Sequence, residues 1–393
     1  MIHRSRWTWA LAVGAVLACD HAATAPDAKS TPEGHGGASG NPFVGATFYV
    51  NPDYAAKIEA TAATHPAQAE RLRKAEAFPT AVWLDSMAHV RLPSRHLDEA
   101  LAEQKRTGRP VVSVFVVYDI PGRDCAAEAS SGELDLATGM GLYASDFIDV
   151  IAAQFHDHSS QRIVAILEPD SLANLATNLN MARCKAADRT YRQAIAYAIR
   201  KLAMPNVSLY LDAAHAGWLG WDGNRAKIAH IFREVLDDAG GVDTIRGFST
   251  NVSNFDTLSD GDGKRLEPSA PCPDELTYVE KLSASLADVG ISGKGFIVDT
   301  GRNGRGGIRS KRGVWCNLKG AGLGERPRSA PAPGVDAYFW VKPPGDSDGA
   351  SEPSASGYDA ACAGEDSASG APPAGHWFAG YFIELAANAT PPL

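Results

Sequence analysis

Polar residues that could exchange protons with a substrate recur at one kind of position in this sequence. Each stands at or near the C-terminal end of a short apolar run: Asp119, Asp170, Asp212, Asn254, Asp299 and Lys342. Two carboxyl groups whose surroundings push their pKa values apart can act as general acid and general base. A single aspartate at such a position can equally cap the helix that follows. Taken together, these residues favour a hydrolase or lyase that works with carboxylates.

The apolar runs predict the elements that would position these residues. Seven of them have the length and composition of buried strands, at residues 81–84, 111–119, 162–170, 207–215, 245–254, 295–299 and 336–342. Amphipathic stretches of helical length lie between most of them, at 97–105, 146–156, 191–202, 226–237 and 276–286. This alternation predicts an α/β fold with a parallel sheet and outer helices, either doubly wound or closed into a barrel. A barrel would gather the strand-terminal residues on one rim, where barrel enzymes place catalytic groups.

Five longer motifs follow the predicted strands. They read VYDIPGRDC at 117–125, ILEPDSLANL at 166–175, LDAAHAGWLGW at 211–221, STNVSN at 249–254 and WVKPPGDSDG at 340–349. In this combination and order the sequence resembles glycoside hydrolase family 6, the inverting cellulases, from about Asn41 to the C-terminus. The resemblance implies a distorted seven-stranded parallel β/α barrel with the active site at the C-terminal ends of its strands. It implies cellulose and cello-oligosaccharides, which are β-1,4-glucans, as substrates.

The resemblance also assigns catalytic roles. Hydrolysis with inversion needs an acid for the departing oxygen and a group opposite that assists a water, so the two carboxyl groups lie ~6.5–9.5 Å apart. Asp170 matches the general acid, and Asp124 matches the carboxylate that raises the pKa of this acid and stabilises the developing positive charge. Asp348 matches the candidate base, although a water chain held by groups such as Ser130 is an alternative. Asp212 matches a supporting carboxylate beside the acid.

Aromatic and polar residues near the same strand ends match the substrate contacts of the family. A pyranose ring has an apolar face that stacks on an indole, while most indoles fill cores. Core packing is therefore the expectation for Trp83 and Trp340, which lie on predicted strands. The matching stacking positions are Trp218, Trp221 and Trp315, the matching polar positions are His215, Asn254, Lys342 and Asp346, and Tyr118 matches a position beside the sugar that distorts. No metal constellation surrounds His215 in the sequence, and the resemblance implies neither metal nor cofactor.

The cysteines indicate an oxidising compartment. Apart from Cys19 the chain has an odd five, without the short paired spacing of a zinc site. Two disulfide bonds and one spare thiol are the natural interpretation, but the spacing alone does not assign the pairs. The resemblance implies the pairs Cys125 with Cys184 and Cys316 with Cys362, which leaves Cys272 unpaired.

The N-terminus has the pattern of an export signal. Arg4 and Arg6 precede an apolar stretch over residues 7–17, which is too short to span a bilayer. The run Val-Leu-Ala-Cys at 16–19 resembles a bacterial lipobox, in which Cys19 would be lipidated; ordinary cleavage nearby is the alternative. We therefore expect a signal peptide at 1–19, a flexible linker at 20–41 and a catalytic domain at 42–393, with no membrane contact except through the lipid anchor.

The composition excludes several other classes of protein. The 393 residues suffice for one large domain or two small ones. The 37 basic and 46 acidic residues give a net charge of −9, and an acidic chain without a basic stripe is a poor binder of nucleic acid. After residue 17 no apolar run approaches the ~20 residues that span a bilayer. We expect a monomer.

The loops bear on the mode of attack. The stretches 124–143 and 348–377 are both long, as in cellobiohydrolases that enclose the glucan in a tunnel and release cellobiose from its non-reducing end. The alternative within the family is an endoglucanase with an open cleft. There are two further alternatives: a surface protein that binds glucan without cutting it, and an enzyme for another polysaccharide. The presence of Asp170 argues against a protein that only binds.

Overall fold

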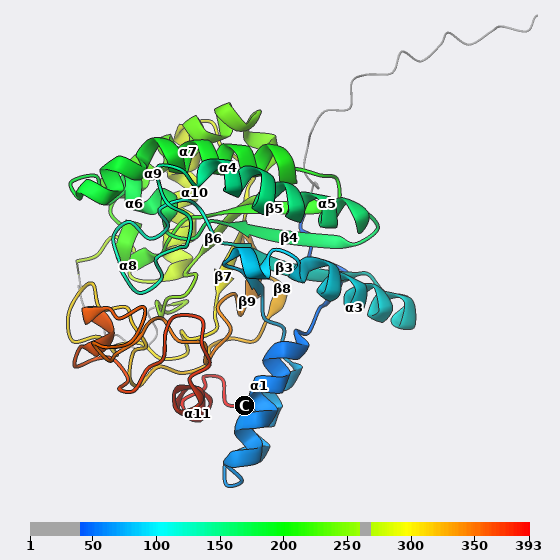
Figure 1. The fold of residues 1–393 in the computed structure, drawn as a ribbon, viewed down its shortest axis with the longest axis vertical. Helices are drawn as coiled ribbons and strands as arrows, with labels where there is room; N and C mark the ends of the chain where they lie inside the picture. Colours follow the sequence, from blue (N-terminus) through cyan, green and yellow to red (C-terminus); the bar gives the residue numbers. More distant parts are fainter. Residues whose placement is uncertain (1–39, 260–268) are drawn as a thin grey trace, which may run out of the picture. The chain divides into compact units, whose positions relative to one another are not determined.

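Seven parallel strands form the centre of the computed structural model, which describes residues 40–259 and 269–393. In spatial order they are β2 (Val82–Leu84), β3 (Val111–Val117), β4 (Arg162–Leu167), β5 (Val207–Asp212), β6 (Gly247–Thr250), β7 (Gly295–Asp299) and β9 (Val335–Phe339) (Figure 1). Within the described residues one parallel bridge, from Thr80 to Trp340, joins the outer strands β2 and β9. The sheet is thus a distorted seven-stranded α/β barrel, as the resemblance implies. The expected signal peptide, Cys19 and residues 20–39 of the expected linker lie outside the described residues.

Two additional strands extend this sheet and were not predicted. β1 (Thr47–Phe48) pairs with β3 in parallel, and β8 (Arg328–Ala332) pairs with β9 in antiparallel orientation. β1 has only two residues, and β8 has exposed residues and a proline where a buried strand would be apolar. Neither segment has the apolar pattern by which the other strands could be found.

All seven predicted strands are present, but five of them were predicted too long at their C-terminal ends. β3, β4, β5, β6 and β9 end two to four residues before the predictions do. Beyond these ends the backbone takes left-handed conformations at non-glycine residues, with φ of 46° at Glu168, 67° at Asp170, 53° at Ala214 and 61° at Asn251. Such conformations break the ladder of hydrogen bonds, so the polar ends of the motifs form loops at the rim of the barrel.

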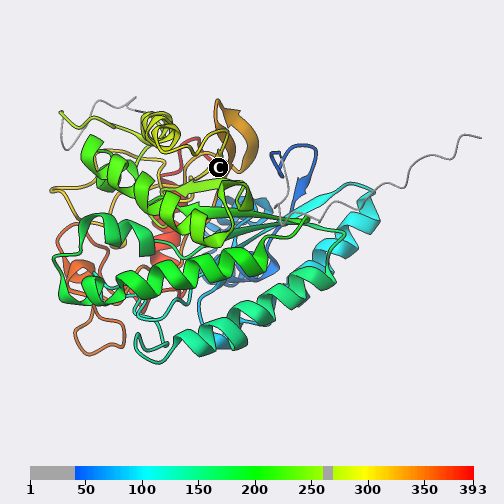
Figure 2. The same ribbon diagram turned by 90° about the horizontal axis from the view of Figure 1, so that it is seen from above.

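Five long helices cover the outside of the barrel (Figures 1 and 2). They are α3 (Leu92–Thr107), α5 (Asp149–Asp157), α7 (Ala182–Leu202), α9 (Asp222–Ala239) and α10 (Glu275–Asp288), and each contains or overlaps a predicted helix. Side chains alternate along β3, where Val114 and Val116 pack inside the barrel and Phe115 and Val117 pack against the helices. Burial on both faces explains why the strands read as nearly continuous apolar runs.

Shorter elements connect the strands to these helices. They are α4 (Met140–Leu142), the π-helical turn η3 (Tyr143–Ile148), α6 (Ser171–Thr177), α8 (Ala216–Leu219) and the 3-10 turns η1 (Lys74–Ala77), η2 (Met87–His89), η4 (Val242–Thr244) and η5 (Ala360–Ala363). α6 and α8 begin at the rim, within the motifs at 166–175 and 211–221. None of the helices in residues 40–259 and 269–393 combines the length and apolar character needed to cross a membrane.

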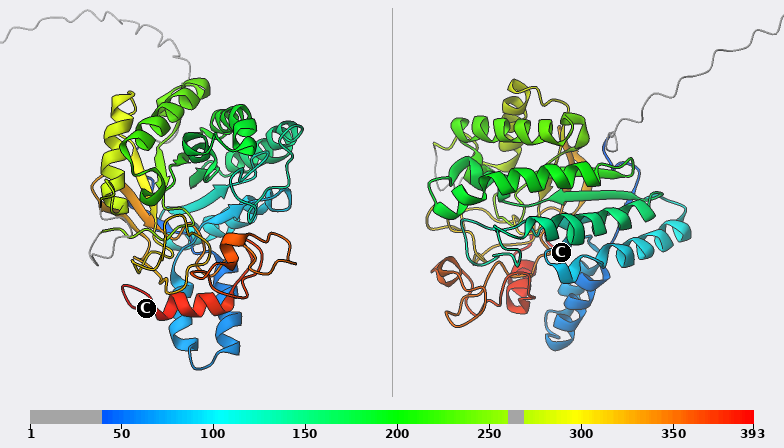
Figure 3. Two further views of the ribbon diagram at one scale, coloured as in Figure 1. Left: turned by 90° about the vertical axis from the view of Figure 1, so that its left-hand side faces the viewer. Right: turned by 45° about the horizontal axis from the view of Figure 1, so that its top comes forward.

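The two ends of the described chain pack against each other. α1 (Pro52–Thr64) and α2 (Ala69–Arg73) lie beside the C-terminal helix α11 (Ala379–Ala387) (Figure 3). The ring of Tyr54 meets those of Trp377 and Phe382 edge-on, at centroid distances of 6.0 and 6.2 Å. This packing brings α1, which was not predicted, to the wall of the cleft described next.

Candidate active site

One cleft of about 1300 Å³ opens at the C-terminal ends of the strands. It is lined by these residues that the sequence singles out: Tyr118, Asp124, Ser130, Asp170, His215, Trp218, Trp221, Asn254, Trp315, Lys342, Asp346 and Asp348. Asp212 is buried behind the lining, where it contacts the backbone of Asp170. The structure therefore brings together residues that lie more than 200 positions apart in the sequence.

Asp170 is placed by the turn that joins β4 to α6. It occupies the position before the first helical residue, but its side chain does not accept a hydrogen bond from the N-terminus of the helix. Its backbone, at φ 67°, lies in the left-handed region, and its N–H donates to Oδ2 of Asp212 at 3.0 Å. The capping role that an aspartate often takes at this position is thus not the role of Asp170. Its half-buried carboxyl lines the cleft instead.

The surroundings of Asp170 favour its protonated form. Burial raises the pKa of this carboxyl well above its usual range, and the negative charges of Asp212 and Asp124 raise it further. The ammonium group of Lys342 acts in the opposite direction. Burial also raises the pKa of Asp212, to about 6, although backbone N–H groups of Asp170 and Ala214 stabilise its charged form. Asp170 can therefore hold a proton at a pH where an ordinary aspartate is ionised.

Asp124 belongs to the loop after β3. Its carboxylate accepts a hydrogen bond from the Ser130 hydroxyl. Burial raises its pKa, while Ser130 and the charge of Arg123 counteract this effect. The next residue, Cys125, forms a disulfide bond with Cys184 at the start of α7, so the loop is tied to an outer helix. This is one of the two pairings that the resemblance implies.

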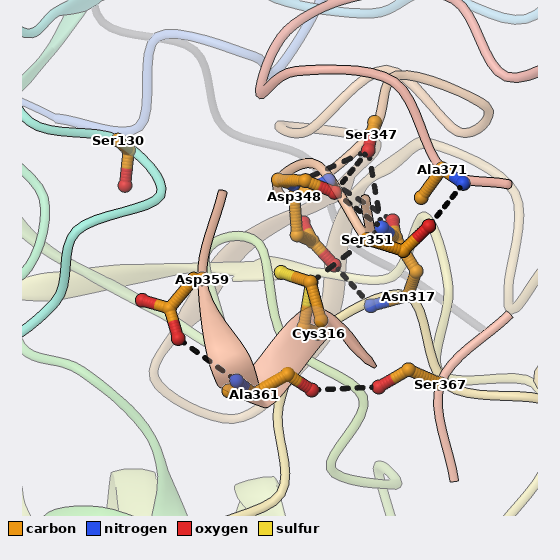
Figure 4. Close-up of a disulfide and its surroundings, with 12 residues drawn as sticks. Ser130, Cys316, Asn317, Ser347, Asp348, Ser351, Asp359, Ala361, Ser367 and Ala371 are labelled. Carbon is orange, nitrogen blue, oxygen red and sulfur yellow. Dashed lines mark hydrogen bonds between the residues drawn. A yellow bond between two sulfur atoms is a disulfide. The ribbon is translucent and has the colours of Figure 1, made fainter. Parts of the chain in front are cut away.

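Asp348 is held by cations. Its Oδ2 accepts hydrogen bonds from Arg302 Nη1 and from the Asn317 N–H, both at 2.8 Å, and its Oδ1 lies 3.6 Å from Lys342 Nζ. Figure 4 shows Asp348 and Asn317 joined beside Cys316, which forms the second disulfide bond, with Cys362. The negative charge of Asp348 is thus paired with two cationic side chains.

Cys272 is the free cysteine of the described residues, as the resemblance implies, and it is buried. Its Sγ accepts a hydrogen bond from Arg225 Nη1 at 3.2 Å.

The indoles lie at different places along the cleft. Trp218 donates through Nε1 to Thr177 Oγ1 at 2.8 Å, and Trp315 packs against the disulfide bond of Cys316. The guanidinium carbon of Arg312 lies 4.0 Å from the ring centroid of Trp221, so one face of this indole is occupied by a cation.

The expectation of core packing is right for Trp340 and wrong for Trp83. Trp340 is fully buried, whereas Trp83 is only half-buried and lines the cleft. Its ring lies 5.5 Å from Lys342 Nζ, and its Nε1 donates to the Val341 carbonyl at 2.9 Å. Trp83 sits on the inner face of the barrel near the rim, a position that the short run 81–84 could not distinguish from the core.

Several cleft residues were missed by sequence reasoning. Lys57 extends from α1 and pairs with the predicted residue Asp346 at 2.8 Å. Arg309 and Arg312, which line the cleft, and Arg302, which is buried against Asp348 and does not line it, come from the glycine-rich loop after β7. The run of arginines and glycines directly after a predicted strand was a usable signal for the last three, but nothing near Lys57 in the sequence connects it to the site.

His215, Asp256 and Glu275 present three groups that could hold a metal ion, with ligand atoms within 4.8 Å of one another. Their contacts argue against a cation. Asp256 Oδ2 accepts the Gly217 N–H at 2.7 Å, Glu275 Oε1 accepts the Ala216 N–H at 2.7 Å, and the guanidinium of Arg309 contacts Asp256 Oδ1 at 2.6 Å. A bound metal ion would be repelled by that guanidinium, so we interpret the group as a hydrogen-bond network.

A second pair of acidic residues lies beneath the site and predicts a pH-dependent stability. Asp119 is fully buried, hydrogen-bonds to no other described residue through its carboxyl, and lies 3.6 Å from Arg123. Burial raises its pKa from 3.8 to about 8, with Arg123 opposing and Glu168 adding to the shift. Burial likewise raises the pKa of Glu168 to about 7.

Because the pKa of Asp119 is higher in the folded state, its protonation stabilises the fold fully below about pH 4. This stabilisation is lost as the pH rises towards about 8, where the folded group ionises. Between about pH 4 and pH 8 we expect the free energy of unfolding of the wild-type protein to fall by roughly 2–5 kcal/mol. In Asp119→Asn this free energy should fall less steeply with pH. Urea unfolding at several pH values measures both slopes; equal slopes in the two proteins would contradict the prediction.

Known proteins are similar to this chain over most of its length. The model of the family "Glycosyl hydrolases family 6" matches residues 43–389. Exoglucanase 3 of Agaricus bisporus is 41% identical over 359 residues, which cover 90% of this chain and 80% of that protein. The 1,4-beta-D-glucan cellobiohydrolase C of Emericella nidulans is 41% identical over 364 residues, covering 90% of this chain and 79% of the relative.

Solved structures are similar over the same part of the chain. The CcCel6A catalytic domain in complex with p-nitrophenyl beta-D-cellotrioside superimposes with a TM-score of 0.87 at 43% identity, covering 91% of this chain and 99% of that one. The catalytic core domain of the cellobiohydrolase Cel6A from Chaetomium thermophilum gives a TM-score of 0.87 at 40% identity, covering 90% and 100%. The fold, the cleft and these similarities together show that this chain belongs to glycosyl hydrolases family 6.

Proposed function

We propose that this protein hydrolyses β-1,4-glucosidic bonds of cellulose and cello-oligosaccharides with inversion, and releases cellobiose from non-reducing chain ends. The observation that carries the proposal is Asp170, whose carboxyl lines the cleft with a raised pKa and takes no part in helix capping. The names of the relatives, an exoglucanase and a cellobiohydrolase, support the substrate class and the mode of attack.

In the proposed mechanism Asp170 donates its proton to the departing glycosidic oxygen. The charge of Asp124 stabilises the positive charge that develops on the sugar, and Asp212 holds the backbone of Asp170 in place. A water attacks from the opposite face. Asp348 is the weaker candidate for the base because Arg302 and Lys342 already lie against its two oxygens. We therefore propose that the attacking water gives its proton to the Ser130 hydroxyl, while Ser130 passes its own proton along the existing hydrogen bond to the Asp124 carboxylate.

Contacts between two loops support the release of cellobiose from chain ends. The loop after β3 and the long loop after β9 both line the cleft. They meet where the Glu128 N–H donates to Asp359 Oδ2 at 3.0 Å, and where a Cβ at Gly357 would lie 3.2 Å from the Ala129 carbonyl oxygen. Loops that touch across a cleft would restrict entry to the end of a glucan chain.

A time course of cellohexaose hydrolysis, with the anomers of the products resolved by NMR, tests the proposal. We expect cellobiose units from the non-reducing end, released first as α-anomers. Products of random size would favour the endoglucanase alternative, and viscosity loss of carboxymethylcellulose relative to reducing ends would quantify it. Binding of cellohexaose without products would instead indicate a glucan-binding protein.

We also propose that the protein is exported and anchored by a lipid on Cys19. The two disulfide bonds support export, because such bonds persist in oxidising compartments. Expression in a bacterium with labelled palmitate tests the anchor. Label on the wild-type protein and none on Cys19→Ala is the expected result, whereas an unlabelled wild-type protein would favour simple cleavage of the signal.

The contact of Arg312 with Trp221 predicts an effect on long substrates. If the exposed face of this indole is a sugar platform, the guanidinium occupies the place of the sugar, at a cation–π energy of about 0.5–1 kcal/mol. We expect Arg312→Ala to lower KM for cellohexaose about 2–5-fold and to leave KM for cellotriose unchanged. The neighbouring exposed residue provides the control Lys311→Ala. A raised KM for cellohexaose would mean that the cation supports the platform instead.

A further inference from the structure

Arg309 connects the glycine-rich loop after β7 to two residues of the cleft. Its Nη1 contacts Asp256 Oδ1 at 2.6 Å, and its Nη2 donates to Asn254 Oδ1. Its Nε donates to the Val314 carbonyl at 2.8 Å, which fixes the guanidinium plane with respect to its own loop. The side chain is mostly buried, with 17% of its surface exposed. Neither the motifs in the sequence nor the proposed mechanism gives this arginine a role.

The contact between Arg309 and Asp256 determines which ring nitrogen of His215 carries a proton and which one faces the substrate. Asp256 Oδ2 lies 2.6 Å from His215 Nδ1 and also accepts the Gly217 N–H. Burial raises the pKa of Asp256, but the charges of Arg309 and His215 outweigh burial and hold this pKa well below its usual range. An ionised carboxylate only accepts hydrogen bonds, so Nδ1 of His215 must carry a proton. Nε2 is then the ring atom left for a substrate, and His215 lines the cleft.

The contact with Asn254 determines which end of its amide faces the cleft. The guanidinium of Arg309 and the Phe255 N–H both donate hydrogen bonds to the side-chain position assigned as Oδ1. Two donors can only be satisfied by the oxygen of the amide, so this orientation follows from the network. The NH₂ group of Asn254 is therefore the part available to a ligand in the cleft that Asn254 lines.

We infer that Arg309 is a positioning residue for substrate recognition, which sets the hydrogen-bonding polarity of His215 and Asn254 toward the hydroxyl groups of the glucan. Asn254 is thereby a donor, while His215 presents Nε2. The inference rests on the proposed function, because it names the residues that recognise the same substrate. It adds that the substrate contacts of both His215 and Asn254 depend on Arg309, which does not itself touch the reacting atoms.

Steady-state kinetics on cellotetraose, with three variants, tests this inference. We expect Arg309→Met to raise KM about 10-fold and to change kcat less, because the contacts that it loses bind the substrate. Arg309→Lys keeps a charge beside Asp256 but cannot also reach Asn254, so an intermediate KM is expected. Arg305→Met, an exposed arginine of the same loop that does not line the cleft, should leave both constants unchanged.

A double-mutant cycle separates positioning from loss of structure. If Arg309 acts through His215 and Asn254, Arg309→Met should raise KM by less than 10-fold in a His215→Ala background and in an Asn254→Ala background; a full 10-fold effect in both backgrounds would overturn the inference. Guanidinium ions should partly restore the KM of Arg309→Ala, and no rescue in a variant with unchanged thermal stability would also overturn it. The ¹⁵N shifts of His215 in the unliganded protein should report a protonated Nδ1 in the wild type and a mixture of tautomers in Arg309→Met. This last measurement needs no turnover, so it remains informative if the protein does not hydrolyse glucan.

Discussion

Asp170→Asn is expected to lower kcat on cello-oligosaccharides by about 10²–10⁴-fold, the typical contribution of a positioned general acid. An amide occupies almost the same volume as the carboxyl but has no proton to give to the leaving oxygen. Binding of cellotetraose, measured by calorimetry, should change little, since the stacking residues and Lys342 remain. Asp157→Asn, at the exposed end of α5, serves as the matched control and should keep full activity.

The pH profile makes the same prediction sharper. The acid must be protonated to act, and its pKa is raised. The wild-type rate should therefore fall as the pH rises through this pKa, at a higher pH than for an ordinary aspartate. A substrate with a good leaving group, which needs no proton, should restore much of the activity of Asp170→Asn. If Asp170→Asn cleaved cellohexaose at the wild-type rate, both the role of Asp170 and the proposed function would be wrong.

Arg302→Met is expected to destabilise the fold by about 3–5 kcal/mol. Arg302 has only 1% of its side chain exposed and is the 2.8 Å partner of Asp348, which is equally buried. It also donates to the Ser253 carbonyl and lies over the ring of Phe255 at 4.2 Å. Removing one member of a buried ion pair leaves the other charge without compensation, apart from Lys342 at 3.6 Å. Denaturant unfolding measures the effect.

Two comparisons isolate the ion pair from the loss of packing. Arg305→Met, exposed on the same loop, should change the free energy of unfolding by less than about 0.5 kcal/mol. Adding Asp348→Asn to Arg302→Met should recover part of the lost stability, because no uncompensated charge then remains. A double variant that is as unstable as the sum of the two single variants would show that packing, rather than charge, dominates at this position.

The sequence was a good guide to the strands for a physical reason. Strands covered on both faces, such as β3 and β4, must be apolar at nearly every residue, and this pattern is visible without a structure. It does not show where pairing stops. At Glu168 and Asn251 the backbone turns into the left-handed region, which the residue types do not reveal. The predicted strands therefore ran into the loops that form the site.

The site was predictable where its residues follow strands. Asp170, His215 and Asn254 stand in motifs next to strand ends, and all three line the cleft. Lys57 was out of reach, because only the packing of α1 on α11 brings it to Asp346. The run of arginines and glycines after β7 points to Arg309, but its role was out of reach, because that role depends on a contact with Asp256 in the loop after the neighbouring strand β6. Contacts between distant segments leave no local trace in one sequence.

The left-handed residues at the rim limit how far this protein can be made heat-resistant. Glycine adopts that backbone conformation without a steric penalty, so Ala214, at φ 53°, could be replaced by glycine to gain stability. Asp124 and Asp170, at φ 60° and 67°, cannot be exchanged in this way without losing their carboxyl groups. Every active variant therefore keeps the backbone strain at these two residues, of order 1 kcal/mol each. Directed evolution for stability at high temperature must compensate for this strain with substitutions outside the rim.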